Sequence, residues 1–335
     1  MTAPLRIGSL CTGYGGLDMA VQDVLGGDVV WVADPDPGAS RVLAHHHPDV
    51  PNLGDLTVTD FGHVEPVDVV CGGYPCQPFS TAGLRKGVED ERHIWPHIAR
   101  ALGVLRPRYA VFENVAGHLR RGFDVVLADL ARLGFDAEWV CVPASDVGAP
   151  HGRRRLFLLA VAAADTPHLR HQRARTTRDG RPRPAHGRLA PTDAGSPGLE
   201  VGPIEPDGPQ RPTPERSRGE PAADTDRVRR GPHQPHLRAG QPDSVWGRYA
   251  PAIRRWEHVT GRAAPRATDL RDRLNPAFVE WMQGLAAGHV TDVPGLTRTQ
   301  QLTALGNGVV PQQAEMALVH LLGNAVRVDE GGIAA

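Results

Sequence analysis

The feature that most constrains the fold is an apolar, β-branched run, Val67–Cys71, which leads into two glycines and then two prolines. Such a run is typical of a buried strand. Cys76 follows between Pro75 and Pro78, so we expect its thiol in a short rigid turn beyond the strand's carboxyl end, where open α/β sheets bind ligands. A lone cysteine is more often packed and inert. The flanking prolines favour an exposed nucleophile, which reacts as its thiolate.

The N-terminal stretch predicts a ligand pocket. Residues 5–24 have the pattern of a strand, a glycine-rich turn and an amphipathic helix, and such a turn lets a ligand approach the backbone closely. A second strand, Asp28–Ala33, ends at Asp34, where α/β proteins often bind ribose hydroxyls. Asp55, before the third strand, is placed to face an adenine amino group. Taken alone, the turn indicates only a tight bend, and Asp34 could be a solvated turn acid.

Further along, a strand at Arg108–Phe112 runs into Glu113, a carboxylate placed to hold a base edge or move a proton. The alternative is an ordinary acid before the helix expected at 123–133. Helical periodicity is also expected at 93–105 and strands at 139–143 and 156–162. Arg153 and Arg155 precede the last of these strands, where arginines are usually just a solvated turn.

Composition excludes several classes of protein. The chain has 335 residues, long enough for two domains, and a net charge of −1, so nucleic-acid contacts must come from local arginine clusters. The four cysteines lack paired spacing, which supports neither a zinc site nor a disulfide framework, and we expect no metal. No signal core or membrane-spanning run is seen, so a cytoplasmic location is expected.

Together these stretches resemble the motifs of a known enzyme family. Residues 75–80, Pro-Cys-Gln-Pro-Phe-Ser, resemble the nucleophile motif of DNA (cytosine-5) methyltransferases of bacterial or phage type. Glu-Asn-Val at 113–115, the arginine pair Arg153 and Arg155, and the segments 273–284 and 305–311 resemble further motifs of that family, in its usual order. A nicotinamide enzyme could share the glycine turn but would not explain Pro-Cys-Gln.

The resemblance implies a function and a set of site residues. The cofactor would be S-adenosyl-L-methionine and the substrate cytosine in double-stranded DNA. Cys76 would attack carbon 6 of a flipped-out base, Glu113 would hold its N3/N4 edge, and Arg153 and Arg155 would steady it. Cofactor-binding residues would be Cys11, Gly13, Tyr14, Gly15, Gly16, Asp34, Pro35, Asp55, Leu56, Pro75, Asn307 and Gly308; DNA-binding residues would be Gln77, Ser80, Arg85, Lys86 and Arg92.

Four positions depart from the family's common residues. Cys11 stands where many members have an aromatic residue, Pro35 where many have tryptophan, His151 for a glutamine and Gly308 for a serine. The first two bear on cofactor affinity. An RNA cytosine methyltransferase and a DNA-binding relative without catalysis remain as alternatives, although the Cys-Phe-Thr tripeptide of the RNA enzymes is missing.

The expected fold class is α/β, a Rossmann-like S-adenosylmethionine-dependent methyltransferase domain with a small target-recognition region and a long low-complexity insert. We expect a catalytic domain at 1–165, a mostly disordered insert at 166–245, a target-recognition region at 246–290 and a returning segment at 291–335. The insert is predicted because that stretch is dense in Pro, Arg, Gly and His and lacks aromatic residues. The expected state is a monomer, with any cognate restriction endonuclease acting separately.

Overall fold

The computed structural model describes residues 3–75, 94–163 and 241–330, with side chains up to residue 323. All of them belong to one compact unit, which comprises Met1–Asp179 and Arg238–Ala335; a second unit, Gly180–Leu237, lies outside the described residues. Most of the predicted insert lies outside them as well. The described chain resumes at Gln241, so the last residues assigned to the insert already form helix α6 (Asp243–Trp246).

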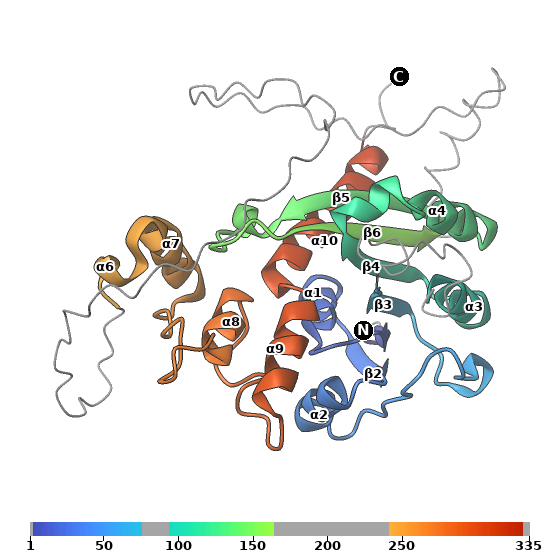
Figure 1. The fold of residues 1–335 in the computed structure, drawn as a ribbon. Helices are drawn as coiled ribbons and strands as arrows, with labels where there is room; N and C mark the ends of the chain where they lie inside the picture. Colours follow the sequence, from blue (N-terminus) through green and yellow to red (C-terminus); the bar gives the residue numbers. More distant parts are fainter. Residues whose placement is uncertain (1–2, 76–93, 164–240, 331–335) are drawn as a thin grey trace, which may run out of the picture. The chain divides into compact units, whose positions relative to one another are not determined.

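The centre of the unit is a mixed sheet. Its strands are β1 (Arg6–Leu10), β2 (Asp28–Ala33), β3 (Val69–Gly73), β4 (Tyr109–Val115), β5 (Phe135–Pro143) and β6 (Arg154–Ala162). They lie in the order β2-β1-β3-β4-β6-β5, and β6 runs antiparallel to both of its neighbours (Figure 1). Strand β5 begins four residues before the predicted Trp139. The expected α/β class is confirmed.

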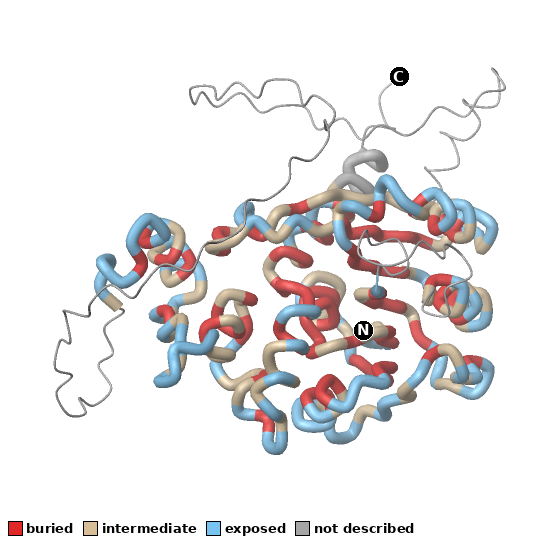
Figure 2. The backbone as a smooth tube through the Cα atoms, viewed as in Figure 1, coloured by how far each residue is buried: buried red, intermediate tan, exposed pale blue. Residues whose placement is uncertain are grey.

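Alternation along the strands sends side chains to two different cores. On one face, residues such as Val70 and Leu158 pack with α3 (Trp95–Leu105) and α4 (Phe123–Arg132). On the other, Val69 and Phe157 are among those packing with α1 (Gly16–Leu25) and α10 (Pro311–Glu330). Because successive strand residues point to opposite faces, a strand covered on both sides is apolar throughout. Figure 2 shows this burial along the strands and the helices beside them.

Side-chain caps begin three of the described α-helices. The Asp34–Pro37 stretch, interpreted above as a turn, leads into α2 (Pro37–His46), whose N-cap is Asp36; its Oδ1 accepts from the Gly38 and Ala39 amides. Helix α8 (Pro276–Met282) begins after Asn275, whose side chain accepts from Ala277 N. A capping box at Thr297 and Gln300 starts α9 (Arg298–Asn307). The short 3-10 turns are η1 (Phe61–His63), η3 (Ala116–Arg120), η4 (Ala144–Val147) and η6 (Gly247–Tyr249).

Helices α6, α7 (Ala250–Thr260) and α8 share a small aromatic core of their own. It contains Trp246, Ile253, Trp256, Phe278 and Trp281, and the Trp256 indole donates to the Trp281 carbonyl at 2.8 Å. The apolar residues of α7 therefore share one buried face of the helix. The target-recognition role of this region stays a prediction. No helix in the described ranges is long and apolar enough to cross a membrane.

Candidate active site

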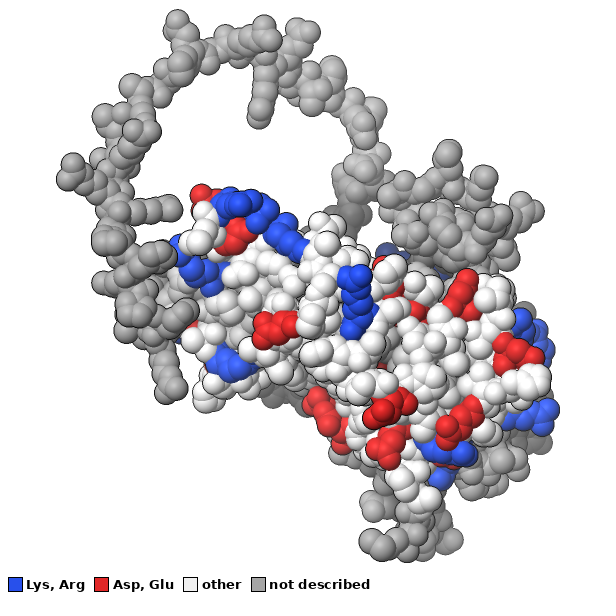
Figure 3. Space-filling model, turned by 90° about the horizontal axis from the view of Figure 1, so that it is seen from below, with Lys and Arg blue, Asp and Glu red and all other residues white. Residues whose placement is uncertain are grey.

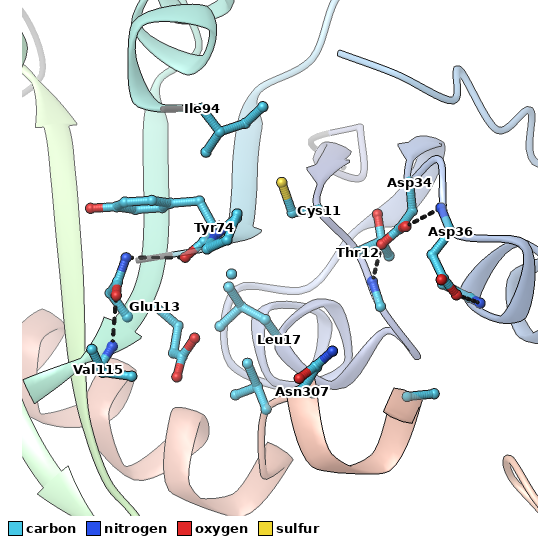
Figure 4. A pocket seen from close by; sticks show the side chains of 18 of the residues that line it. Cys11, Thr12, Leu17, Asp34, Asp36, Tyr74, Ile94, Glu113, Val115 and Asn307 are labelled. Atoms are coloured by element: carbon cyan, nitrogen blue, oxygen red, sulfur yellow. Dashed lines mark hydrogen bonds between the residues drawn. The ribbon is translucent and has the colours of Figure 1, made fainter. Parts of the chain in front are cut away.

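A cavity of about 930 Å³ opens at the carboxyl ends of β1 to β4, where parallel strands present their following turns to one edge of the sheet. A cavity of this size suits a nucleotide-sized ligand. Figure 4 shows Asp34 and Glu113 on opposite sides of it, with Cys11 and Leu17 between them. The segment before α10 also lines it, through Asn307, Gly308 and Val309.

The Asp34 side of the cavity is polar and acidic. The Asp34 carboxylate accepts the Gly13 amide at 2.8 Å and the Asp36 amide at 2.9 Å, which fixes the glycine turn to the end of β2. Burial raises the pKa of Asp34, while these two amides act to lower it. Thr12 Oγ1 lines the same space and is buried without a hydrogen-bond partner among the described residues. Such an orphaned hydroxyl is what a missing polar ligand would leave.

Two more groups border this side. Asp55 is exposed, and the Thr57 amide, donating at 2.9 Å, lowers the pKa of its carboxyl. Cys11 adopts a left-handed backbone with φ of 51°. Burial, with the nearby Asp34 and Asp55 charges, raises the pKa of its thiol to about 12, so it faces the cavity as a neutral, weakly polar group.

On the opposite side a buried carboxylate and a guanidinium form an ion pair. Arg155 Nε lies 2.8 Å from Glu113 Oε1, and the Glu113 side chain is only 9% exposed. Burial raises the Glu113 pKa to about 7, although Arg155 and Arg153 both act to lower it. Gly73 lies opposite Glu113 in the sheet, and a Cβ there would come within 3.3 Å of Glu113 Oε2, so a glycine leaves room for the carboxylate.

Arg153, predicted beside Arg155 as a base-steadying residue, has other partners. Its guanidinium donates to the carbonyls of Gly306 at 2.8 Å and Gly308 at 2.9 Å, just where α9 ends. A cation at the carbonyl end of a helix is favourable. Arg153 still lines the cavity, but its contacts make it a brace between β6 and the returning segment.

The glycine at position 308, where the sequence resemblance leads one to expect serine, has a steric cause. A Cβ at Gly308 would overlap the ring of Tyr14, which is buried and donates its hydroxyl hydrogen bond to the Val309 carbonyl. Tyr14 therefore lies in the small core with Val42 and Leu305 rather than in the cavity. His151, the departure beside the arginines, hydrogen-bonds the Met282 carbonyl at 3.0 Å and so ties this turn to α8.

The structure gathers most of the predicted residues around one cavity. It is lined by Cys11, Gly13, Asp34, Pro35, Asp55, Leu56, Pro75, Glu113, Arg153, Arg155, Asn307 and Gly308, but not by Tyr14, Gly15 or Gly16. Gly15 and Gly16 instead begin α1, and a Cβ at Gly16 would overlap the Val309 carbonyl. Cys76, Gln77, Ser80, Arg85, Lys86 and Arg92 lie outside the described residues.

Sequence reasoning missed several lining residues. Tyr74, which precedes Pro75, accepts from Asn114 Nδ2 through its carbonyl at 3.0 Å and bonds His118 Nε2 through its hydroxyl at 2.9 Å. This pairing links the end of β3 to the end of β4. Arg120 and Arg121 also line the cavity; the only signal for them was an adjacent arginine pair shortly after Glu113.

The charges in the cavity are segregated. Asp34, Asp36 and Asp55 lie on one side, whereas Arg155 pairs with Glu113 on the other, and Arg120 and Arg121 follow β4, the strand that carries Glu113; the buried Asp18 also lines the cavity. Elsewhere, acids and bases are interspersed on the face drawn in Figure 3, as the near-zero net charge suggests. No cluster of metal-ligating side chains occurs among the described residues. The arrangement suits a ligand with cationic or hydroxyl groups at one side and an anionic one at the other.

The chain is similar to known DNA methyltransferases. The sequence model of the family described as "C-5 cytosine-specific DNA methylase" matches residues 5–189. The chain is 33% identical over 141 residues to the Type II methyltransferase M.NlaIV of Neisseria lactamica, covering 38% of this chain and 33% of that protein. It is 39% identical over 144 residues to the DNA N-6-adenine-methyltransferase of Escherichia phage P1, covering 38% and 19%.

The matches therefore span about a third or less of the length of these two relatives. Over nearly the whole chain, the fold is similar to that of the Entamoeba histolytica methyltransferase EhMeth. The TM-score is 0.55 at 13% identity, and the superposition covers 96% of this chain and 99% of that one. At this identity the likeness concerns the fold alone. The methyltransferase-like α/β class predicted from the sequence is confirmed.

Proposed function

Because the chain belongs to the C-5 cytosine-specific DNA methylase family, we propose that it transfers a methyl group to carbon 5 of cytosine in double-stranded DNA. The observation that carries the proposal is the Glu113–Arg155 pair at the cavity. Burial raises the pKa of this carboxyl to about 7, which favours its protonated form, and in that form it can donate to N3 of cytosine while its other oxygen accepts from the N4 amino group.

The Asp34 side of the cavity fits S-adenosyl-L-methionine. Asp34 would accept from the ribose hydroxyls, Asp55 would face the adenine amino group, and Pro35 and Leu56 would supply apolar contact to the ring. The unpartnered Thr12 hydroxyl and the open space beside Gly13 leave room for such a ligand. When bound, this cofactor supplies an electrophilic methyl group.

The protein's residues would act on the base in sequence. The Cys76 thiolate adds to carbon 6 and forms an S–C6 bond, while Glu113 donates its proton at N3 so that electron density reaches carbon 5. After carbon 5 is methylated, transfer of the carbon 5 proton to solvent restores the double bond and breaks the S–C6 bond, which releases the thiolate, and N3 returns its proton to the Glu113 carboxylate. Arg155 holds the Glu113 carboxyl in orientation throughout. Removing one contact that stabilises the transition state typically raises the activation free energy by about 3–4 kcal/mol.

The segregated charges indicate where DNA would lie. Arg120 ends the 3-10 turn η3 just after β4, Arg121 follows it, and both line the cavity near the end of the strand that carries Glu113. Both are exposed. Cations at this position would attract the phosphates on either side of an extruded cytosine, whose removal from the stack costs a few kcal/mol. We assign the DNA backbone to this side of the cavity.

The test is to incubate the protein with labelled S-adenosyl-L-methionine and mixed DNA, and then to sequence for 5-methylcytosine and N6-methyladenine. We expect 5-methylcytosine, none with Cys76→Ala, and a covalent adduct on 5-fluorocytosine DNA with the wild type only. Methylation of adenine, or of RNA alone, would contradict the proposal, and no transfer to any substrate would favour a DNA-binding relative without catalysis.

The proposal also concerns the oligomeric state and the location of the protein. We propose a monomer that acts in the cytoplasm, with any cognate restriction endonuclease acting as a separate protein. Sedimentation at the concentrations used for activity tests the monomer, since a dimer as the active species would contradict it.

A further inference from the structure

The side chain of Asn52 bonds to the backbone on both sides of Asp34. Asn52 Oδ1 accepts from the Asp34 amide at 3.0 Å, and Asn52 Nδ2 donates to the Asp34 carbonyl at 3.0 Å. The same amide group accepts from the Gly54 N–H at 3.0 Å and donates to Ser40 Oγ at 3.1 Å. A primary amide has two donor hydrogens and two acceptor sites, so all of its capacity is used.

The backbone explains why this amide lies there. Asn52 pairs with Val32 of β2 as a short parallel bridge, in which Val32 N donates to the Pro51 carbonyl at 3.0 Å and Leu53 N to the Val32 carbonyl at 2.7 Å. Beyond that point the chain turns at Gly54, whose φ is 69°, and the ladder ends. The Asn52 side chain continues the ladder by one step, because its amide acts as a substitute peptide group for Asp34.

Two cofactor subsites meet at this amide. Asp34 is the proposed ribose acid, and Gly54 precedes Asp55, the proposed partner of the adenine amino group. Ser40 Oγ donates to the Asp34 carbonyl at 3.1 Å, so α2 joins the same network. Resting on the proposed function, we propose that Asn52 is a positioning residue, which holds the ribose-binding and adenine-binding carboxylates at a fixed separation.

If Asn52 had a purely structural role, its substitution would mainly lower the stability of the fold. Asn52 is exposed and belongs to neither core on the two faces of the sheet, so its truncation should remove little buried surface. Its effect should instead fall on how well Asp34 meets the ligand. Hydrogen bonds to an ionised carboxylate contribute about 1.5–3 kcal/mol, but only when their geometry is held.

The experiment measures recognition of the ribose hydroxyls. Calorimetry compares S-adenosylhomocysteine with its 2′,3′-dideoxy analogue, for the wild type, for Asn52→Ala and for Asn275→Ala. Asn275 is a matched control, because it is another asparagine that bonds backbone groups, at the start of α8 outside the cavity. We expect the wild type and the control to prefer the parent compound by roughly 10- to 100-fold.

Asn52→Ala should bind the parent about tenfold more weakly and the analogue almost unchanged, so the preference shrinks while the unfolding temperature moves by only a few degrees. If this variant fails to fold, the isosteric Asn52→Asp, which keeps both acceptor bonds and loses both donors, gives the same comparison. A full preference in the Asn52 variant would overturn the inference alone. No preference in the wild type would overturn the ribose role of Asp34, and the inference with it.

Discussion

Arg155 Nε and Glu113 Oε1 lie 2.8 Å apart because β4 and β6 are antiparallel neighbours in one particular register. Glu113 is opposite Phe157, and Val115 is opposite Arg155. Arg155 therefore lies two residues along β6 from the partner of Glu113, on the same face of the sheet. Such diagonal neighbours are within reach of a long side chain. The pair at the proposed base site is thus a consequence of sheet register.

Glu113→Gln should lower kcat by about 10²- to 10³-fold, since an amide has no proton to give to N3. The fold should persist, because the substitution keeps the shape and removes a buried charge. Single-turnover methylation measures the first effect and thermal unfolding the second. An unfolded variant would indicate that Glu113 is needed for structure.

The pH dependence of kcat/KM should report the same carboxyl. Glu113 acts in its protonated form, so activity should fall as pH rises through about 7 and this fall should vanish in Glu113→Gln. The sign for stability is the same. The folded-state pKa exceeds the ordinary 4.5, so the native state binds more protons and this group's contribution to stability decreases as pH rises from about 4.5 to about 7.

Arg155→Gln should move that alkaline fall to higher pH while lowering kcat. The Arg155 charge acts to lower the Glu113 pKa, so its removal leaves burial to raise the pKa further. If kcat/KM of Arg155→Gln still fell at the wild-type pH, the two groups would not be coupled in solution. Arg154→Gln is the matched control, because Arg154 is the adjacent arginine on β6 and is exposed.

Arg153→Ala should act mainly on stability. The guanidinium donates hydrogen bonds to carbonyls at the end of α9, and hydrogen bonds made by a charged group contribute about 1.5–3 kcal/mol. We expect a lower unfolding temperature, together with weaker binding of S-adenosylhomocysteine, because Asn307 and Gly308 line the cavity. An unchanged unfolding temperature with a large loss in kcat would indicate that Arg153 contacts the base directly.

Arg120→Gln and Arg121→Gln should each weaken DNA binding and reduce the salt dependence of log K by about one unit of slope, as expected for one lost phosphate contact. Binding of S-adenosylhomocysteine should not change. Arg132→Gln is the control, since Arg132 is an exposed arginine paired with Asp129 on α4. Equal salt slopes in all three variants would place the DNA backbone elsewhere.

The local sequence pattern was enough to predict much of the fold and of the candidate site. Strand β2 has the bounds that its apolar run predicts, and α8 begins at the asparagine and proline that predict it. The motifs and their order identified the family, and they placed Asp34 and Glu113 at the carboxyl ends of two parallel strands, β2 and β4, of one sheet. These features depend on residues close together in the chain, where periodicity and capping operate.

Only the tertiary structure decided which distant groups touch. Arg153 meets the carbonyl of Gly306 rather than Glu113, Tyr14 faces a small core with Leu305, and the Asn52 amide lies on Asp34. Each contact depends on a strand register or on the way a helix returns to the sheet, which are set by packing between segments far apart in sequence. The sequence by itself therefore determined which chemical groups are present at the strand ends, and packing determined which of them act on one another.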